Sequence, residues 1–299
     1  MTEWKTSSLL MKVSPDAVIQ EVRLQPEGRP LLARPTPILQ ARDGTKLFPA
    51  ACLESQGEGT WCVTFDGCRC RVLLEVVADP ARITFTVKEV AGGEPDELVL
   101  ADLPLCFPGM VGGIAGIVRN EQQALAIQGL TWFTDVGVEC VTGRDESPVE
   151  ACLPKGSGAS DGREPVRFWA RAVRRAGLVG ARWCLFACPA AQCLAVVEQI
   201  ERAEPGLPCL TDAQGIWLRN SPESRKAYLA IYETDIFNPH RLLEYAVQGG
   251  FHYLYLGDPT WAQTWGHFEI QDRNFPAGEK DLIRFGREAQ RRGDRKSVV

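Results

Sequence analysis

The feature that most constrains the fold is an alternation of strand and helix patterns near the end of the chain. Residues 226–232 form an apolar, strand-like run, and residues 238–247 follow with the spacing of an amphipathic helix. A second apolar run, residues 251–256, precedes another amphipathic segment, Glu279 to Arg292, which Gly293 ends. Strands that alternate with helices pair in parallel, so this region predicts the opening of a barrel of alternating strands and helices.

Only two strand-helix units fit into this region. Residues 294–299, Asp-Arg-Lys-Ser-Val-Val, follow the second helix where a third apolar strand would be expected. Two units cannot close an eight-fold barrel. We therefore expect residues 226–299 to be an incomplete barrel start and the chain to be the front part of a larger protein.

The region before it, residues 16–142, has a different pattern. Short runs rich in Val, Ile, Phe and Thr alternate with turn residues, and Asp66-Gly67 between two such runs is a strong hairpin signal. Residues 83–88 alternate apolar and polar side chains. The expected strands are 17–24, 46–53, 61–65, 69–76, 82–90, 97–100, 114–118, 124–127 and 136–141. This spacing, without long helical patterns, favours an antiparallel β-sandwich.

The predicted fold class is therefore mixed, an antiparallel β-sandwich followed by a partial α/β segment of TIM-barrel type. We assign residues 1–180 to the sandwich domain, with a polar loop at 155–164. Residues 181–225 form a connection with one strand (182–188) and one helix (190–203). Residues 226–299 form the barrel start.

Composition excludes some classes of protein and partner. The formal net charge is -5 and the pI is near 5.4, and no basic stripe is interleaved with aromatic residues, which argues against nucleic-acid binding. No run approaches the roughly 18 apolar residues of a membrane span. The first residues lack the basic and apolar regions of a signal peptide, so we expect a cytoplasmic protein, although export is not excluded. The oligomeric state is not predicted.

Eleven cysteines occur, and no two have the CxxC spacing of a zinc knuckle. Cys68 and Cys70 share a strand face, but no second Cys or His cluster lies nearby to complete a metal site. Most cysteines lie in apolar runs. We favour reduced thiols packed in the core, with no metal or other cofactor, while disulfide bridges stay open if the protein is exported.

Polar and aromatic residues follow the two expected barrel strands, at the ends where ligands bind in parallel strand-helix folds. Carboxylates accept hydrogen bonds from sugar hydroxyls, and an indole can stack on the C–H face of a pyranose. The alternative is that the tryptophans plug the barrel mouth, the aspartate after the second strand caps a turn, and the histidine is a surface residue without a role. The candidate sugar-binding residues are Asp235, Asp258, Trp261, Trp265, His267 and Glu269.

No nucleophile motif is present. GxSxG is absent, because Gly156-Ser157-Gly158 has no strand before it. The glycine-rich residues 109–116 lack the preceding βαβ strand of a dinucleotide loop and favour a tight β connection. His252 alternates within the second barrel strand, so we expect it to be packed, and we expect His240 to be solvated near a helix start.

Together these residues resemble a known family. A β-sandwich followed by a strand ending in Asp258-Pro259-Thr260-Trp261, then Trp265 to Ile270 (Trp-Gly-His-Phe-Glu-Ile), then Asn274 to Gly278 before a helix, is similar to glycoside hydrolases of the α-galactosidase-like (melibiase-type) group. The similarity extends to their multidomain relatives, in which a sandwich precedes a (β/α)8 barrel. Its specific part covers residues 226–293.

The resemblance implies roles for some of the candidate residues. In that group the loop after the second barrel strand binds the terminal sugar through an Asp and an aromatic residue, which match Asp258, Trp261 and Trp265, with His267 and Glu269 as neighbours. The nucleophile and the acid/base carboxylate come from later strands. The resemblance therefore assigns the catalytic role to no residue of this chain, and Asp235 matches none of the residues by which that group binds its sugar.

Two functional readings follow. The chain is the N-terminal portion of a glycoside hydrolase-like, carbohydrate-active enzyme that is catalytically incomplete by itself, or it is a non-catalytic carbohydrate-binding or interaction protein. A complete enzyme within 299 residues is disfavoured, because no full catalytic constellation is visible. In both carbohydrate readings the ligand is a sugar of undetermined identity and linkage.

Overall fold

The computed structural model describes residues 1–26, 28–112, 116–140, 158–160, 165–222, 224, 226–232, 238–264 and 266–292. The chain divides into two compact units, Met1–Cys209 and Leu210–Val299. None of the helices within the described ranges has the length and apolarity that a membrane crossing requires. Each unit has its own hydrophobic core.

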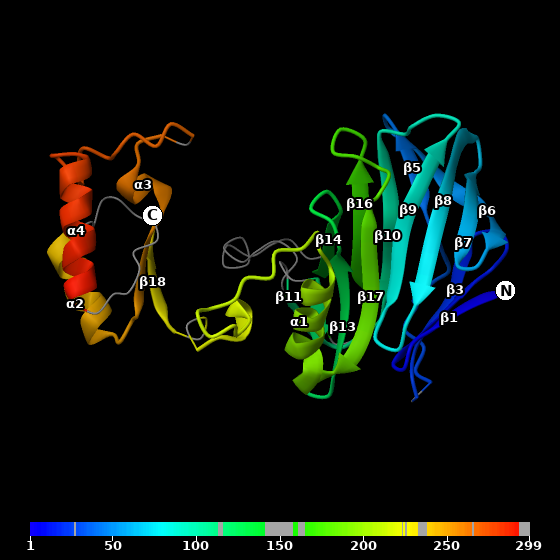
Figure 1. Cartoon of the computed structure of the whole chain (residues 1–299), viewed down its shortest axis with the longest axis horizontal. Coiled ribbons are helices and arrows are strands. Elements are labelled where there is room, and N and C mark those ends of the chain that lie inside the picture. Colours follow the sequence, from blue (N-terminus) through cyan, green and yellow to red (C-terminus); the bar gives the residue numbers. More distant parts are fainter. Residues whose placement is uncertain are drawn as a thin grey trace. The chain divides into compact units, whose positions relative to one another are not determined.

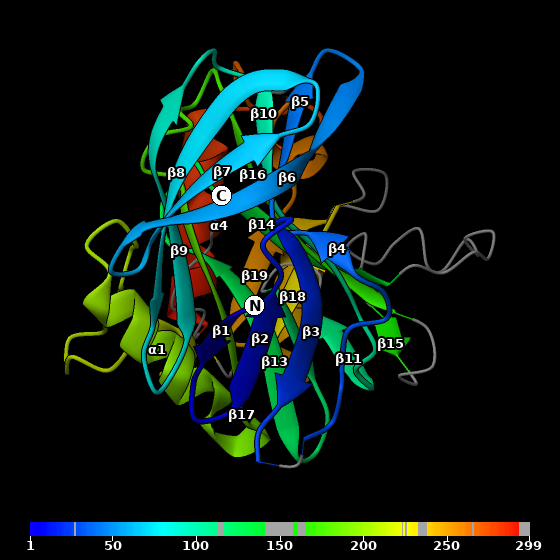
Figure 2. The same ribbon diagram turned by 90° about the vertical axis from the view of Figure 1, so that its right-hand side faces the viewer.

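Antiparallel strands dominate the first unit, as Figures 1 and 2 show. A four-stranded sheet has the order β1-β2-β3-β4, and a thirteen-stranded sheet has the order β14-β16-β10-β5-β6-β7-β8-β9-β17-β13-β12-β11-β15. The strands of the smaller sheet are β1 (Thr2–Lys5), β2 (Leu9–Val13), β3 (Val18–Leu24) and β4 (Thr36–Pro37). Those of the larger sheet are β5 (Gln40–Asp43), β6 (Lys46–Gly57), β7 (Thr60–Phe65), β8 (Cys68–Ala78), β9 (Ile83–Ala91), β10 (Glu97–Leu105), β11 (Gly109–Gly112), β12 (Ile117–Arg119), β13 (Gln123–Gly129), β14 (Asp135–Cys140), β15 (Gly158–Ser160), β16 (Val166–Val173) and β17 (Arg182–Pro189).

The larger sheet is strongly curved and nearly closed. Strand β14, at one end of the order, contacts β13 and β11 near the other end. The predicted antiparallel class of this region is confirmed. The described strands do not form a clear sandwich of two separate sheets, because most of them belong to one sheet that returns on itself. The predicted hairpin at Asp66-Gly67 is confirmed: it joins β7 to β8, and Gly67 has the positive φ of 70° that its turn requires.

One hydrophobic core holds both sheets of the first unit together. It contains buried side chains from β1, β2 and β3 and from most strands of the larger sheet. Aromatic rings connect the two sheets: Trp4 of β1 meets Trp61 and Phe85 edge-on, with ring centroids 6.0 and 5.5 Å apart. Phe85 in turn stacks on Trp183 at 4.1 Å. Burial of rings of this size supplies a large share of the stability of such a core.

Within the described residues of the first unit, one α-helix packs against the larger sheet. After β17, the 3-10 helix η2 (Ala190–Gln192) leads into α1 (Cys193–Ala203), which lies against β17 (Figure 1). The strand predicted at 182–188 thus lies between β9 and β13 in the sheet. The clean alternation expected for residues 83–88 is incomplete, because Thr84 is also buried. Its cross-strand partner is Cys184 of β17, so it shares the sheet face that carries α1.

The second unit contains a parallel β-α-β segment. Strand β18 (Tyr228–Ile231) pairs in parallel with β19 (Tyr253–Leu256), and α2 (Pro239–Gln248) connects them. Helix α2 begins as its sequence predicts, with Pro239 at the first turn and the Asn238 side chain accepting a hydrogen bond from the Arg241 backbone amide at 3.0 Å. After β19 come α3 (Asp258–Trp261) and α4 (Glu279–Arg291). The barrel to which this segment would belong stays a prediction.

The core of the second unit lies on one face of the two strands. It is formed by side chains of α2, β19, α4 and the segment before α4, namely Leu243, Leu254, Leu256, Phe275, Phe285 and Ala289. Residues of β18, Leu229 and Ile231, pack at its edge. The other face carries Tyr228 and Tyr232, which are exposed, and Tyr255, whose ring lies 5.7 Å from that of Tyr232. The sheet is therefore covered on one face and lined by tyrosines on the other.

Candidate functional site

The candidate site lies where β18 and β19 end. Because Ile231 is the partner of Leu256 in the parallel register, Tyr232 and Gly257 follow at the same edge. The Gly257 amide donates to the Ile231 carbonyl at 2.7 Å. A Cβ at Gly257 would lie 2.4 Å from the Tyr232 ring, so only glycine lets that ring pass over the strand end. The two strand ends are held closely together, and Asp258 follows at once.

Asp258 is the first residue of α3 and is half-buried. Its carbonyl accepts from the Ala262 amide at 2.7 Å, whereas its carboxylate makes no hydrogen bond or ion pair with the part of the chain that the structure describes. The turn itself is held by other groups: the Thr260 hydroxyl donates to the Ile231 carbonyl at 3.2 Å, and the Asn274 side chain donates to the Thr260 carbonyl at 2.7 Å. The Asp258 carboxylate can accept hydrogen bonds from a ligand, and the turn does not depend on it.

The segment after α3 folds back beside it. Ala262 and Ile270 form an isolated antiparallel bridge, the Gln263 amide donates to the Glu269 carbonyl at 2.7 Å, and the Gln263 side chain donates to the Ile270 carbonyl at 2.9 Å. These contacts close a loop that carries His267 and Glu269, both exposed. The loop therefore places two further polar side chains next to the α3 turn.

Trp261 and Phe268 form an aromatic pair at this loop. Their rings are nearly parallel, with an interplanar angle of 7° and centroids 5.6 Å apart. Trp261 also packs against the core of the second unit, and its indole N–H is buried without an acceptor among the described residues. Phe268 is 47% exposed. One face of the Trp261 indole, which was predicted to stack on a sugar, is thus covered by Phe268. The exposed aromatic ring of the pair is that of Phe268.

The sequence reasoning did not single out Phe268 or Tyr232. Phe268 reaches Trp261 because Gly266 and Phe268 both have positive φ values, 86° and 51°, which turn the loop back. Apart from the glycine, composition gives no signal of that turn. Tyr232 could have been found, since it alternates with Tyr228 along an apolar strand.

The remaining predicted residues are not brought to this site by the described structure. Asp235 and Trp265 lie outside the described residues. The expectation that His252 is packed within a strand is wrong: β19 begins at Tyr253, and His252 precedes it as an exposed residue at the opposite end from Asp258. Among the described residues, no group of three or more His, Cys, Asp or Glu side chains could hold a metal ion.

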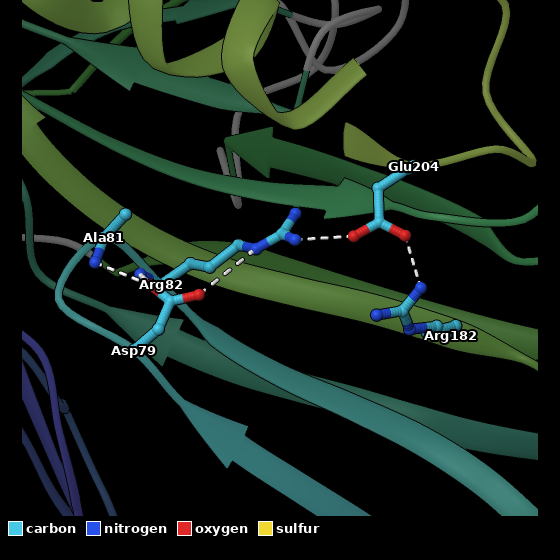
Figure 3. Close-up of polar contacts among 5 residues, drawn as sticks. All are labelled: Asp79, Ala81, Arg82, Arg182 and Glu204. Carbon is cyan, nitrogen blue, oxygen red and sulfur yellow. Dashed lines mark hydrogen bonds and ion pairs between the residues drawn. The ribbon is translucent and has the colours of Figure 1, made fainter. Parts of the chain in front are cut away.

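A buried charge cluster in the first unit contrasts with this open site. Glu204, which is 4% exposed and follows α1, is paired with Arg82 and with Arg182 (Figure 3). The turn that carries Arg82 is itself fixed, because Asp79 accepts backbone hydrogen bonds from Ala81 at 2.7 Å and from Arg82 at 2.9 Å. Both Glu204 oxygens are engaged by the protein. This cluster holds the end of α1 on the sheet and leaves no carboxylate for a ligand.

Comparisons with known proteins find similarity only at the level of solved structures. No protein-family model matches the sequence, and no curated protein sequence matches it. The backbone is similar to a bacterial glucoamylase complexed with acarbose (9% identity, TM-score 0.45, covering 66% of this chain and 35% of that one). It is also similar to the α-N-acetylgalactosaminidase NagBb from Bifidobacterium bifidum (9% identity, TM-score 0.44, covering 97% of this chain and 58% of that one).

The chain spans less than two thirds of the length of both proteins. At 9% identity and with TM-scores below 0.5, neither similarity assigns this chain to a family, a substrate or an activity.

Proposed function

We propose that the chain is carbohydrate-active and is the N-terminal portion of a glycoside hydrolase-like enzyme. In this proposal a β-rich domain precedes the start of a (β/α)8 barrel, and a sugar binds at the edge formed by the ends of β18 and β19. The motif resemblance of residues 226–293 to α-galactosidase-like hydrolases supports the class. The parallel β-α-β segment within that range is the arrangement with which such a barrel begins.

The observation that carries the proposal is the position of Asp258. Its carboxylate follows directly on β19 and is unengaged by the described residues, while aromatic side chains, Phe268 with Trp261 and Tyr232, lie around the same turn. A carboxylate accepts two hydrogen bonds from neighbouring hydroxyl groups of a sugar ring. An exposed aromatic face covers the C–H side of such a ring.

Each candidate residue has a role in the proposal. Asp258 accepts hydrogen bonds from the hydroxyl groups, Phe268 provides the exposed stacking face, and Trp261 supports that face from behind. His267 and Glu269 supply further polar contacts from the loop. Asp235 and Trp265 stay candidates from the sequence alone.

Turnover is not expected from these 299 residues. Retaining glycoside hydrolysis needs two carboxyl groups about 5 to 5.5 Å apart across the scissile bond. In the group that the sequence resembles, both catalytic carboxylates come from later barrel strands. We therefore expect binding without hydrolysis, and a protein whose native role is non-catalytic carbohydrate binding would give the same result for this chain.

The test is a binding panel with a matched pair of variants. The thermal midpoint of the chain is measured against monosaccharides and short oligosaccharides, because a ligand that binds only the folded state at 100 times its Kd stabilises it by about 2.7 kcal/mol. We expect one sugar to raise the midpoint of the wild type and of Asp272→Ala, a control at an exposed aspartate. Asp258→Ala should abolish that shift.

Two results would contradict the proposal: no shift with any sugar from a folded sample, or a shift that Asp258→Ala leaves intact. Nitrophenyl glycosides added to the same samples measure turnover. Hydrolysis that is retained by a purified chain would overturn the expectation of catalytic incompleteness while leaving the sugar site in place.

A further inference from the structure

The outward face of α4 carries a row of cations. This helix, drawn in red in Figure 1, buries Phe285 and Ala289 in the core of the second unit. Its basic residues recur at intervals of four, three and four positions, which places them within about 60° of the helix circumference and roughly opposite the buried residues. We call these four residues, all of them exposed, the basic stripe: Lys280, Arg284, Arg287 and Arg291. The stripe is roughly 16 Å long.

The carboxylates beside the stripe are less exposed than the arginines and are engaged by them. The Asp281 side chain is 13% exposed and accepts a hydrogen bond at 2.7 Å from Arg284, which is 81% exposed. The Glu288 side chain is 23% exposed and pairs with Arg291 and with Arg292, which follows the helix. Ion pairs of exposed arginines are weak, and each guanidinium keeps further N–H donors for a ligand.

The other two cations of the stripe are not compensated. Lys280 and Arg287 form no hydrogen bond or ion pair with the residues that the structure describes. They alternate with the two paired arginines, so the stripe carries a surplus of positive charge along its length. The whole chain has a formal net charge of -5, so its overall field repels polyanions. Attraction of a polyanion is therefore local to the stripe, within a Debye length of about 8 Å at physiological ionic strength.

The composition of α4 narrows the class of anionic partner. A helix that lies in a membrane surface inserts its apolar face, but the apolar face of α4 is buried in the core of the second unit. Single-stranded nucleic acids are bound by stacking on aromatic side chains, and the stripe contains none. Protein interfaces have an apolar centre, whereas Ile283 is the one large apolar side chain of α4 that is exposed. These features favour a linear polyanion that is bound through its charges.

We propose that the basic stripe binds a linear acidic polysaccharide of the class that carries a carboxylate on each sugar ring. Successive cations of the stripe are spaced about 4.5 to 6 Å along the helix axis. Carboxylates that recur with the sugar rings of an extended chain have a spacing of the same order, so several can be bound at once. The carbohydrate class rests on the proposed function, whereas the preference for an anion rests on the stripe alone. The site is separate from the edge of β18 and β19.

The test is equilibrium binding of the whole chain to immobilised polygalacturonate, with immobilised dextran as the neutral reference polymer. We expect binding to polygalacturonate at low ionic strength and none to dextran. Binding should weaken steeply as the ionic strength rises to the physiological value, because exposed charges are screened by salt. Absence of binding to polygalacturonate at low ionic strength, or equal binding to dextran, would overturn the proposal.

Charge-matched variants locate the site. Lys280→Gln and Arg287→Gln should each weaken binding about fivefold, the effect of one cation near an anionic surface. Glutamine is a good helix former, so α4 should stay folded, which circular dichroism checks. The controls, Arg34→Gln and Arg175→Gln, remove the same charge from exposed positions of the first unit and should leave binding unchanged. Equal weakening by the controls would show that net charge alone matters and would overturn the assignment to the stripe.

Two further comparisons separate this site from other partners and from the proposed sugar site. Polyglutamate and duplex DNA are measured under the same conditions, and binding to either that equals or exceeds binding to polygalacturonate would overturn the choice of a polysaccharide. Asp258→Ala should leave polygalacturonate binding unchanged, and the stripe variants should leave the thermal shift with the panel sugar unchanged. Failure of the sugar panel alone would contradict the proposed function, whereas failure of polygalacturonate binding alone would contradict this inference.

Discussion

The two units of this chain bury their sheets to different extents. In the first unit, the core is continuous across both sheets, and the buried Glu204 has both of its oxygens paired with arginines. In the second unit, a two-stranded parallel sheet is covered on one face only, and Tyr228 and Tyr232 on its other face are 64% and 61% exposed. Parallel sheets are normally covered on both faces, and an isolated pair of strands is marginal.

This difference suggests that the first unit provides most of the stability and the second unit provides the ligand site. The first unit has the size and the closed core of a domain that folds alone. The second unit depends on α2 and α4 for its small core. It nevertheless carries the Asp258 carboxylate, which has no partner among the described residues, and the exposed ring of Phe268. The region with the weaker core is thus the one with the candidate ligand site.

The largest effect is expected from Phe285→Ala. Phe285 is buried in the small core of the second unit and contacts Phe275 at a ring distance of 6.2 Å. Its truncation should cost that unit about 4 kcal/mol and unfold it while the first unit stays folded. Limited proteolysis should then leave a stable fragment ending near Cys209. Ile283→Ala, at a 45% exposed position of the same helix, is the control and should resist cleavage as the wild type does. Simultaneous loss of both units would show that they fold as one.

A smaller loss is expected in the first unit from Glu204→Ala. It would leave Arg82, whose side chain is 13% exposed, with only the longer 3.8 Å ion pair to Asp79. The expected cost is about 3 kcal/mol, the low end for a broken buried pair, because Asp79 remains and Arg182 is one-third exposed. Urea unfolding measures the change in the free energy of unfolding. The matched control, Glu198→Ala, removes a more exposed ion pair with Arg202 on the same helix and should cost under about 0.5 kcal/mol. Equal losses of unfolding free energy in the two variants would contradict the claim that the buried Glu204 ion pairs stabilise the first unit more than the exposed Glu198 pair does.

The smallest effect concerns pH and the surface of the first unit. The Gly44 amide, which donates to Asp96 at 2.8 Å, holds the pKa of that carboxyl below its ordinary value, with Arg174 adding to the effect. Because the pKa is lowered on folding, the stabilisation is present above the ordinary carboxyl pKa of about 4 and is lost as the pH falls through the folded value. Asp96→Asn should therefore lower the thermal midpoint slightly at pH 7 and leave it unchanged near pH 2. A difference that grows in acid would have the wrong sign.

Much of the fold was readable from local patterns. Alternation and turn residues predicted β7, β8 and β13 closely, and the helical spacing of residues 238–247 predicted α2. Strand β16 was missed although its burial alternates along Val166–Val173, because it directly follows a polar loop. The order of the thirteen strands could not be predicted from the sequence, since it depends on pairings between strands far apart in sequence.

The candidate site was readable only in part. The place of Asp258 after β19 followed from the strand pattern, and the structure agrees with it. The stacking of Phe268 on Trp261 could not be predicted from the sequence, because it depends on the positive φ values of Gly266 and Phe268, which turn the loop back.

The central claim is that a sugar binds at the edge of β18 and β19 and that the first unit takes no part. Hydrogen exchange of the whole chain, with and without the saturating sugar from the binding panel, tests this most directly. We predict added protection in peptides covering residues 253–271 and none in β1 to β17. Protection within the first unit, or the same protection in Asp258→Ala, would contradict the account.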